Sequence, residues 1–211
     1  MRHVTAVMLG AVGSICGAFA EQTPGPAQAV SDLLAGRFRW SVGAPLVSPA
    51  NRPADPCRSI KDPSIVYYDG RWHLFCTIRS EKRTHQIEYL SFDDWPQANA
   101  AKRHILAITD GYFCAPQVFY FAPSKKWYMI HQTTAPSRKP ALQPAYSVST
   151  NIADPASWSK PVLLFEQQPD NVTGWIDFWV ICDDACAHLF FTSNNGLMWR
   201  AETKLADFPR G

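Results

Sequence analysis

The sequence predicts an all-β fold made of repeated antiparallel hairpins, and three observations support this prediction. Short runs of β-branched and aromatic residues alternate with turn residues along most of the chain. One hairpin pattern occurs three times, beginning at residues 61, 114 and 175. No window of 12 residues shows the periodicity of an amphipathic helix, so we expect strands rather than helices.

The N-terminal residues differ in composition from the rest. A basic start and an apolar run lead to Ala18-Phe19-Ala20, a small-x-small cleavage site. This pattern predicts a secretory signal peptide over residues 1–20, because the apolar run is too short to span a membrane. Residues 21–36 are polar and contain prolines, so we expect a leader or linker there. Residues 37–211 remain for one domain with a single core.

The first repeat, KDPSIVYYDGRWHLFCTIR, has the pattern of a β-hairpin. Strand-forming residues at 65–68 precede Asp69-Gly70, a two-residue turn, and a second strand begins at Trp72. Pro63 disfavours the helical region for the residue before it. We therefore expect the Asp62 carboxylate to lie on extended chain at the entrance of a strand.

The second and third repeats follow the same pattern. CAPQVFYFAPSKKWYMIHQ and WIDFWVICDDACAHLFFTS each contain a polar residue, a strand, a short turn and a second strand. We align Ile65, Val118 and Phe178 as equivalent positions. A further strand-like segment follows each hairpin, at residues 87–92, 144–150 and 197–202.

A repeat of this length with about four short strands is typical of a β-propeller blade. The innermost strand of a blade lines the central channel, so its polar entrance residue faces the channel mouth. Asp62, Gln117 and Asp177 are such residues, and we expect them to converge on one pocket.

Composition limits the classes of partner. The net charge is only +2 and the basic residues are scattered, so we expect neither a nucleic-acid surface nor a membrane partner. The chain contains eight Trp, seven Tyr and twelve Phe. Aromatic faces stack on sugar rings, but they also fill sheet cores, and both interpretations remain open.

Five cysteines lie beyond the predicted signal peptide, so at least one has no partner within the chain. Cys182 and Cys186 flank a turn, and a disulfide across that hairpin is compatible with an exported protein. His188 lies close to them, but no second ligand pair has metal spacing, so we expect no zinc site. The other three are Cys57, Cys76 and Cys114.

Seven segments together resemble glycoside hydrolase family 62, the secreted α-L-arabinofuranosidases that remove arabinose side chains from arabinoxylan. The resemblance spans roughly residues 37–211 and implies a five-bladed β-propeller, of which about three blades are present. Family 43 shares the fold and is the main alternative. The segments are FRWSVGAPLVSP, IKDPSIVYYDGRWHLF, YLSFDDW, APQVFYFAPSKKWYMIHQT, AYSVSTNIADPASWS, GWIDFWVICDD and LADFPRG.

The resemblance implies an inverting mechanism, which uses a base and an acid about 6.5 to 9.5 Å apart. Asp62 matches the general base, and Asp177 matches a third carboxylate that orients the acid and raises its pKa. Lys61 is expected to contact the sugar or to fix the base. Strand position alone suggests further substrate contacts, for which core packing is an equal alternative: Gln117, Gln132, Tyr146 and Trp175.

The general acid of the family is a glutamate beyond the last residue of this sequence, and none of the glutamates present starts an innermost strand. We therefore expect the 211-residue chain to be inactive on arabinoxylan, and a non-catalytic carbohydrate-binding remnant is the competing hypothesis. No cofactor is expected to be required, although such propellers often hold calcium in the channel. The expected partner is arabinoxylan or its oligosaccharides, and a monomer is expected for the full-length enzyme.

Overall fold

The computed structural model describes residues 25–37 and 40–210. The chain divides into two units, Met1–Gly43 and Ala44–Gly211. The described part of the first unit contains helix α1 (Pro26–Leu34). The signal peptide predicted over residues 1–20 lies outside the described residues.

Helix α1 shows that the expectation of strands rather than helices was wrong for residues 26–34, whereas the leader or linker expected over residues 21–36 stays a prediction. Proline at the first turn of a helix costs no hydrogen bond, because the first N–H groups have no partner within the helix. The helix ends with the Ala35 N–H bonded to the Ser31 carbonyl and the Gly36 N–H bonded to that of Leu33. Helix α1 has nine residues, fewer than the 12-residue window in which we looked for helical periodicity. No helix among the described residues is long and apolar enough to cross a membrane.

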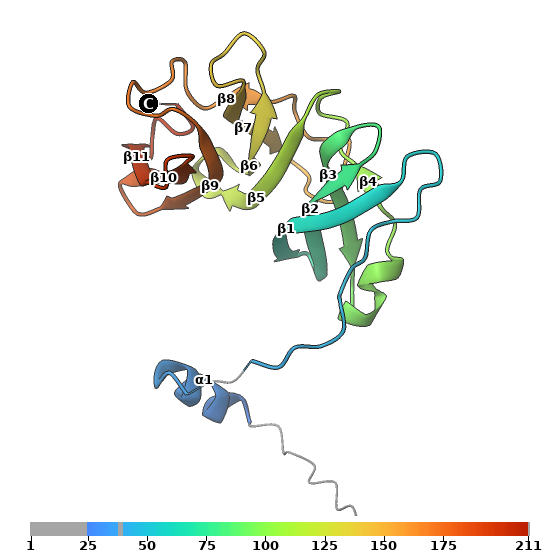
Figure 1. Ribbon diagram of the computed structural model, residues 1–211. Coiled ribbons are helices and arrows are strands. Elements are labelled where there is room, and N and C mark those ends of the chain that lie inside the picture. Colours follow the sequence, from blue (N-terminus) through green and yellow to red (C-terminus); the bar gives the residue numbers. More distant parts are fainter. Residues whose placement is uncertain (1–24, 38–39, 211) are drawn as a thin grey trace, which may run out of the picture. The chain divides into compact units, whose positions relative to one another are not determined.

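The described part of the second unit forms three antiparallel sheets, in which the strands pair in chain order (Figure 1). This confirms the all-β prediction and its three repeats. The first sheet contains β1 (Cys57–Tyr68), β2 (Arg71–Ser80), β3 (Thr84–Phe92) and β4 (His104–Ile105). The second contains β5 (Phe113–Phe121), β6 (Lys126–Thr134), β7 (Leu142–Ser149) and β8 (Val162–Leu163). The third contains β9 (Trp175–Cys182), β10 (Cys186–Ser193) and β11 (Met198–Lys204), and two 3-10 turns are η1 (Trp95–Ala100) and η2 (Ala122–Ser124).

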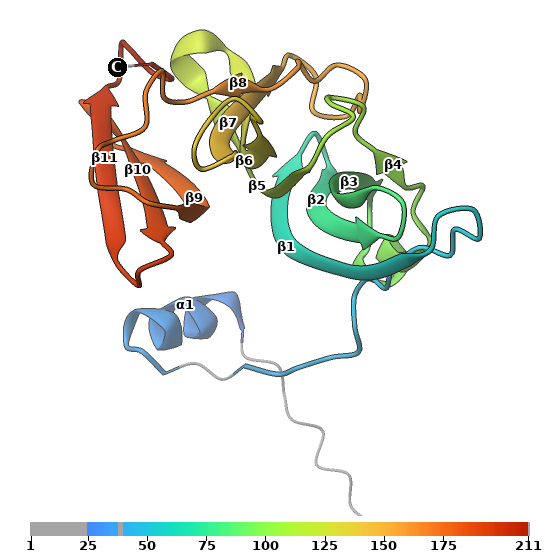
Figure 2. The same ribbon diagram turned by 45° about the horizontal axis from the view of Figure 1, so that its top comes forward.

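The three sheets pack face to face in sequence, like the blades of a propeller. Figure 2 shows β1, β5 and β9 on the inner side of their sheets. One core cluster joins the first and second sheets through residues such as Phe75 and Met129. Another joins the second and third sheets through residues such as Ile130 and Phe191. The described residues therefore form three blades of the predicted propeller.

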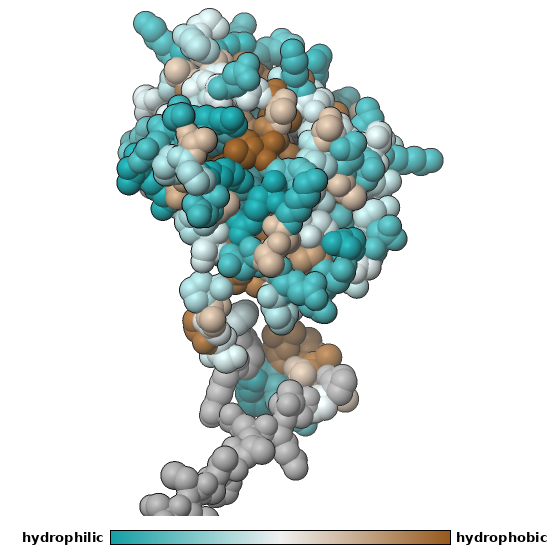
Figure 3. Space-filling model, turned by 90° about the vertical axis from the view of Figure 1, so that its right-hand side faces the viewer, coloured by the Kyte–Doolittle hydropathy of each residue, from teal (hydrophilic) through white to brown (hydrophobic). Residues whose placement is uncertain are grey.

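A buried ion cluster holds the segment before β1 against the first sheet. The Glu88 carboxylate in β3 is fully buried and pairs with Arg52 and Arg103. Arg103 also donates to the Ser48 carbonyl, and the Asn99 side chain accepts from the Ser48 N–H at 2.9 Å. Figure 3 faces the side on which the first sheet lies, where hydrophilic residues surround smaller apolar patches.

A β-bulge interrupts each innermost strand near its start. The register shifts after Lys61 in β1 and after Cys114 in β5, and β9 is irregular opposite Phe190 and Thr192 of β10. In each bulge one residue other than glycine adopts a left-handed conformation. These residues are Asp62 (φ 52°), Ala115 (φ 54°) and Asp177 (φ 58°).

The bulges correct our alignment of the repeats. Ala115, not Gln117, is the equivalent of Asp62 and Asp177. Ile65 follows Asp62 by three residues and pairs with Leu74 of β2, and Val180 follows Asp177 by three residues and pairs with Leu189 of β10. Val180, rather than Phe178, is therefore the equivalent of Ile65. The error arose because a bulge adds a residue without changing the apolar character of the strand. The predicted Asp69-Gly70 turn is confirmed, with positive φ at both residues.

Candidate active site

Asp62 and Asp177 occupy the same place in two different sheets. Each lies in the bulge of an innermost strand, and both have left-handed φ values. Aspartate tolerates this conformation better than most residues, but the conformation still costs free energy. Such backbone strain within a strand often accompanies a functional role. The bulge re-aims each carboxylate away from the regular alternation of the strand.

The Cys114 thiol on β5 lies within the electrostatic influence of both carboxylates. Burial raises the pKa of Cys114, and the charges of Asp62 and Asp177 raise it further. The thiol donates to the Tyr112 hydroxyl oxygen at 3.2 Å and to the Gln132 amide oxygen at 3.7 Å. The first and third sheets therefore bring one carboxylate each toward the start of the second sheet.

Lys61 lies beside the Asp62 carboxylate. Its Nζ atom is 3.8 Å from Asp62 Oδ2, and both side chains remain partly exposed. His85 and Tyr112 lie in the same neighbourhood, with their ring centroids 5.0 Å apart. Burial lowers the pKa of His85, Lys61 and Arg79 lower it further, and Asp62 opposes this effect.

Gln117 and Gln132 are buried and bond to the backbone of β9. The Gln117 amide accepts from the Val180 N–H at 2.6 Å and donates to the Val180 carbonyl at 2.7 Å. Gln132 Nε2 donates to the Trp175 carbonyl at 2.9 Å. The predicted convergence of Gln117 with the two aspartates in the pocket is therefore wrong, because its polar atoms join two sheets.

The equivalent residues of the first sheet make similar links. Ser64 Oγ accepts from the Val118 N–H at 2.9 Å, and Thr77 Oγ1 accepts from the Ala115 N–H at 2.8 Å. Polar side chains from the first two strands of one sheet therefore bond to the innermost strand of the next sheet, from the first sheet to β5 and from the second sheet to β9. These bonds fix the position of each bulge relative to the preceding sheet.

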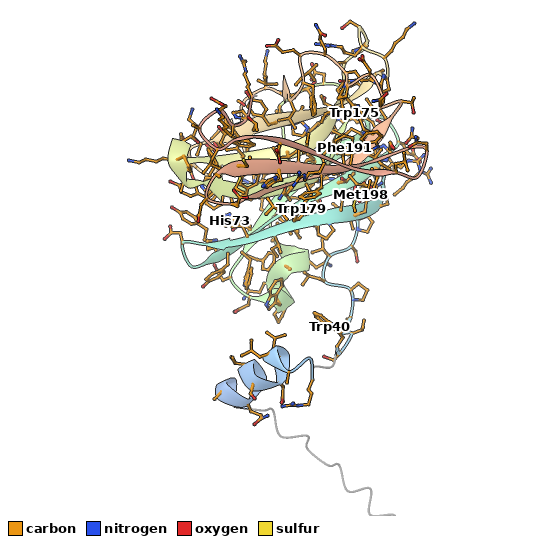
Figure 4. All side chains as sticks on the ribbon, turned by 90° about the vertical axis from the view of Figure 1, so that its left-hand side faces the viewer. Trp40, His73, Trp175, Trp179, Phe191 and Met198 are labelled. Atoms are coloured by element: carbon orange, nitrogen blue, oxygen red, sulfur yellow. The ribbon has the colours of Figure 1, made fainter. Side chains whose placement is uncertain are left out.

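Trp175 and Tyr146 pack among hydrophobic residues. Trp175 is buried, and its indole N–H donates to the Leu142 carbonyl at 2.9 Å. Tyr146 is half-buried, with its ring centroid 5.9 Å from that of Tyr128. Figure 4 labels Trp175 and Phe191 in the third sheet, together with the exposed Trp179 and Met198. A contact of Lys61, Gln117, Gln132, Tyr146 or Trp175 with substrate stays a prediction.

No described glutamate lies in any of the three bulges. Glu88 is buried in its ion cluster, and Glu81 pairs with Arg58 on the surface. Glu202 in β11 pairs with Arg200 at 3.2 Å. Sequence reasoning missed Tyr112, His85 and Ala115, because none of them belongs to a recognisable motif; the positive φ of Ala115 appears only in the folded backbone.

The predicted disulfide is absent, since each of the five cysteines in the described part of the chain is a free thiol. Cys182 lies directly opposite Ala187, so Cys186 is displaced by one residue and its side chain faces the other side of the sheet. The described residues also contain no cluster of three His, Cys, Asp or Glu that could hold a metal ion. The channel calcium stays a prediction.

A sequence model of glycosyl hydrolase family 62 matches residues 39–211, which include all three sheets. The chain belongs to glycosyl hydrolase family 62. This confirms the resemblance carried by the motifs and sets aside the family 43 alternative. Structures of lower identity share the fold alone, such as a family 117 hydrolase from Zobellia galactanivorans at 16% identity and a TM-score of 0.54.

Several α-L-arabinofuranosidases are similar over most of this chain. α-L-Arabinofuranosidase C of Cellvibrio japonicus (strain Ueda107) is 37% identical over 174 residues, which are 82% of this chain and 25% of the relative. The catalytic domain of a Coprinopsis cinerea α-L-arabinofuranosidase is 38% identical with a TM-score of 0.73, covering 82% of this chain and 55% of its own.

An α-L-arabinofuranosidase of Podospora anserina, solved with cellotriose, is 35% identical with a TM-score of 0.70. That match covers 80% of this chain and 53% of the Podospora anserina chain. The chain thus spans a quarter to about half of the length of these relatives.

Proposed function

We propose that the protein is an exported α-L-arabinofuranosidase that removes arabinofuranosyl side groups from arabinoxylan with inversion at the anomeric carbon. Asp62 is the general base in this proposal, and Asp177 is the carboxylate that keeps the pKa of the general acid high. Membership of family 62 supports the substrate class, and the composition of residues 1–20 supports export.

The chemistry assigned to Asp62 follows from inversion. The carboxylate removes a proton from a water molecule while the water oxygen attacks the anomeric carbon. The bond from that carbon to the xylan oxygen breaks on the opposite face of the sugar, and the general acid protonates the leaving oxygen. In this proposal Lys61, which lies beside Asp62, donates a hydrogen bond to a sugar hydroxyl.

One observation carries the proposal. Asp62 and Asp177 come from strands more than a hundred residues apart, yet they occupy the same bulge position and both act on the Cys114 thiol. A regular strand would not produce this pair of left-handed aspartates. Inverting hydrolysis requires a base and an acid; in this proposal Asp62 is the base, and Asp177 lies near it to act on the acid.

A second candidate is a sugar-binding protein that does not hydrolyse its ligand. The observation that favours it is that Ala115, rather than a carboxylate, occupies the third bulge. The two candidates differ in one measurable property. Only the hydrolase breaks a glycosidic bond, and this activity depends on Asp62.

The test uses 2,4-dinitrophenyl α-L-arabinofuranoside, because its leaving group needs no proton from an acid. We expect the chain to release dinitrophenolate and Asp62→Asn to lower the rate about 100-fold. Asp69→Asn is the matched control, since Asp69 is also left-handed but lies in the turn at the other end of β1. A similar loss in both variants, or in neither, would remove Asp62 from the role of base.

A rescue experiment separates chemistry from folding. Ala115 adopts in β5 the conformation that Asp62 adopts in β1, so Asp62→Ala should fold. Azide attacks without giving up a proton, and we expect it to restore dinitrophenolate release to this variant. The product should be the arabinofuranosyl azide of inverted configuration, identified by NMR. Failure of azide to raise the rate would contradict the role of Asp62 as base.

A further inference from the structure

A hollow of about 500 Å³ lies at the same end of the first sheet as Asp62, and the proposed hydrolysis does not use it. It is lined by Arg58, Arg79, Glu81, His85 and Tyr112, with Ser80 and Thr84 between them. Its volume is sufficient for a monosaccharide unit.

The strand register gathers basic side chains on one face of the first sheet. Arg79 lies opposite Ser59 in β1 and opposite His85 in β3, so the three side chains share a face. Lys61 lies opposite Thr77, two residues before Arg79, and therefore shares that face as well. Because the Thr77 side chain bonds to Ala115, this is the face that meets the second sheet.

One positive charge beside the hollow, that of Arg79, is not balanced by a partner. Arg58 pairs with Glu81, and Lys61 lies 3.8 Å from Asp62. Arg79 is exposed and makes no side-chain hydrogen bond or ion pair with any residue that the structure describes. Neighbouring like charges on a sheet are unfavourable unless an anion lies between them. Burial lowers the pKa of His85, and the positive charges of Lys61 and Arg79 lower it further, against the effect of Asp62.

The chemistry of the walls suggests the ligand. A guanidinium binds a carboxylate through two parallel hydrogen bonds, and this geometry is specific to arginine. The rings of His85 and Tyr112, 5.0 Å apart, provide an aromatic wall for the apolar face of a sugar. A neutral sugar would leave the Arg79 charge without a partner. A sugar ring that carries a carboxylate can pair with the Arg79 guanidinium and also pack against the rings of His85 and Tyr112.

We propose that the hollow between Arg79, His85 and Tyr112 binds a uronic acid unit of the polysaccharide whose arabinose is attacked at Asp62. This inference rests on the proposed function for the polysaccharide, but its own content is a preference for substrates that carry a carboxylate. The protein would then select acidic regions of a branched xylan over neutral regions.

The test measures binding rather than hydrolysis, so its failure leaves the proposed function standing. The probes are xylotetraose and the same tetraose bearing one glucuronic acid unit, with affinity measured by calorimetry for the full chain. We expect the acidic probe to bind about tenfold more tightly at low salt, with the ratio falling as salt is added. Equal affinities for the two probes would overturn the proposal.

Two variants connect the preference to the hollow. Arg79→Gln should reduce the affinity ratio to near one, whereas Arg79→Lys should keep only part of it. Arg71→Gln removes a positive charge from the other end of β2, where Arg71 pairs with Asp93 at 2.8 Å, and should leave the ratio intact. A ratio that falls equally in Arg71→Gln would mean that net charge, not the hollow, attracts the acid.

Two further readings separate a sugar site from a simple anion site. Acetate at the same concentration should compete poorly, and strong competition would overturn the assignment to a sugar. The carboxylate should also raise the pKa of His85, which faces Lys61, Arg79, Tyr112 and Asp62, so the affinity ratio should increase as pH falls from 7.5 to 5.5. A His85 NMR titration curve that the acidic probe does not move would contradict contact at this site.

Discussion

The side-chain amide of Gln117 in β5 holds both the N–H and the carbonyl of Val180 in β9, at 2.6 and 2.7 Å. Val180 lies three residues after Asp177, and Gln132 holds Trp175 two residues before it. The second sheet therefore fixes the backbone on both sides of the bulge that carries Asp177. The buried amides of Gln117 and Gln132 therefore help to determine where the Asp177 carboxylate lies.

Replacing Gln117 should destabilise the fold. In Gln117→Leu the buried Val180 N–H and carbonyl lose their partners, and we expect the free energy of unfolding to fall by about 2 to 4 kcal/mol. Urea denaturation followed by tryptophan fluorescence measures the change. Gln97→Leu alters an exposed glutamine in η1 and should change the free energy by no more than about 0.5 kcal/mol. Equal effects in the two variants would show that the two bonds to Val180 contribute nothing.

Asp177→Asn should act on the pH dependence of hydrolysis. If the Asp177 charge keeps the pKa of the general acid high, its removal lowers that pKa and moves the basic limb of the pH–rate profile to lower pH. The profile is to be measured with arabinoxylan on the protein that contains this chain. An unchanged profile at an unchanged rate would leave Asp177 with a structural role only.

The ion cluster of Glu88 and the surface pair of Glu81 form a natural comparison. Glu88→Gln leaves the partly buried Arg52 and Arg103 without their fully buried counter-charge, and we expect a loss of about 3 to 5 kcal/mol in the free energy of unfolding. Glu81→Gln removes only the exposed partner of Arg58, and should cost at most about 1 kcal/mol. The same urea assay serves both variants, and similar costs would contradict the importance of burial.

The buried His131 predicts a loss of stability in acid. Burial lowers its pKa to about 4 in the folded chain, whereas the unfolded chain binds the proton near pH 6.5. The free energy of unfolding should therefore decrease as pH falls from about 6.5 to about 4, by up to about 1.4 kcal/mol per pH unit for this group. His131→Gln should flatten this slope in urea titrations between pH 7 and 4. A slope that stays the same in the variant would exclude His131 as its source.

The 211-residue chain should release no arabinose from arabinoxylan, although we expect it to cleave the dinitrophenyl substrate. Release from xylan needs a proton for the leaving oxygen, and no glutamate in residues 25–37 or 40–210 lies in a bulge with the two aspartates. Chromatography of the products measures arabinose directly. Its appearance would assign the acid to a described glutamate, and Glu81→Gln would then be the first variant to examine, because Glu81 lines the hollow.

Local sequence determined much of this protein. The alternation of strand-forming and turn residues was sufficient to place three hairpins, and Asp69-Gly70 was sufficient for a turn with two positive φ values. The seven segments around and beyond Asp62 were together specific enough to indicate the family. These features are readable because they depend on residues that are neighbours in the chain.

Only the tertiary structure decided which polar residues share a site. A bulge shifts the two-residue period of a strand but does not change the apolar pattern of its sequence. For this reason Gln117 was aligned with Asp62, although the structure shows that Ala115 is the counterpart of Asp62. The gathering of Arg79, His85 and Tyr112 depends on strand pairing and on contact between two sheets. Helix α1 was missed because nine residues carry too little periodicity to be distinguished from a linker. Contacts between distant segments are set by packing geometry, which no short stretch of sequence contains.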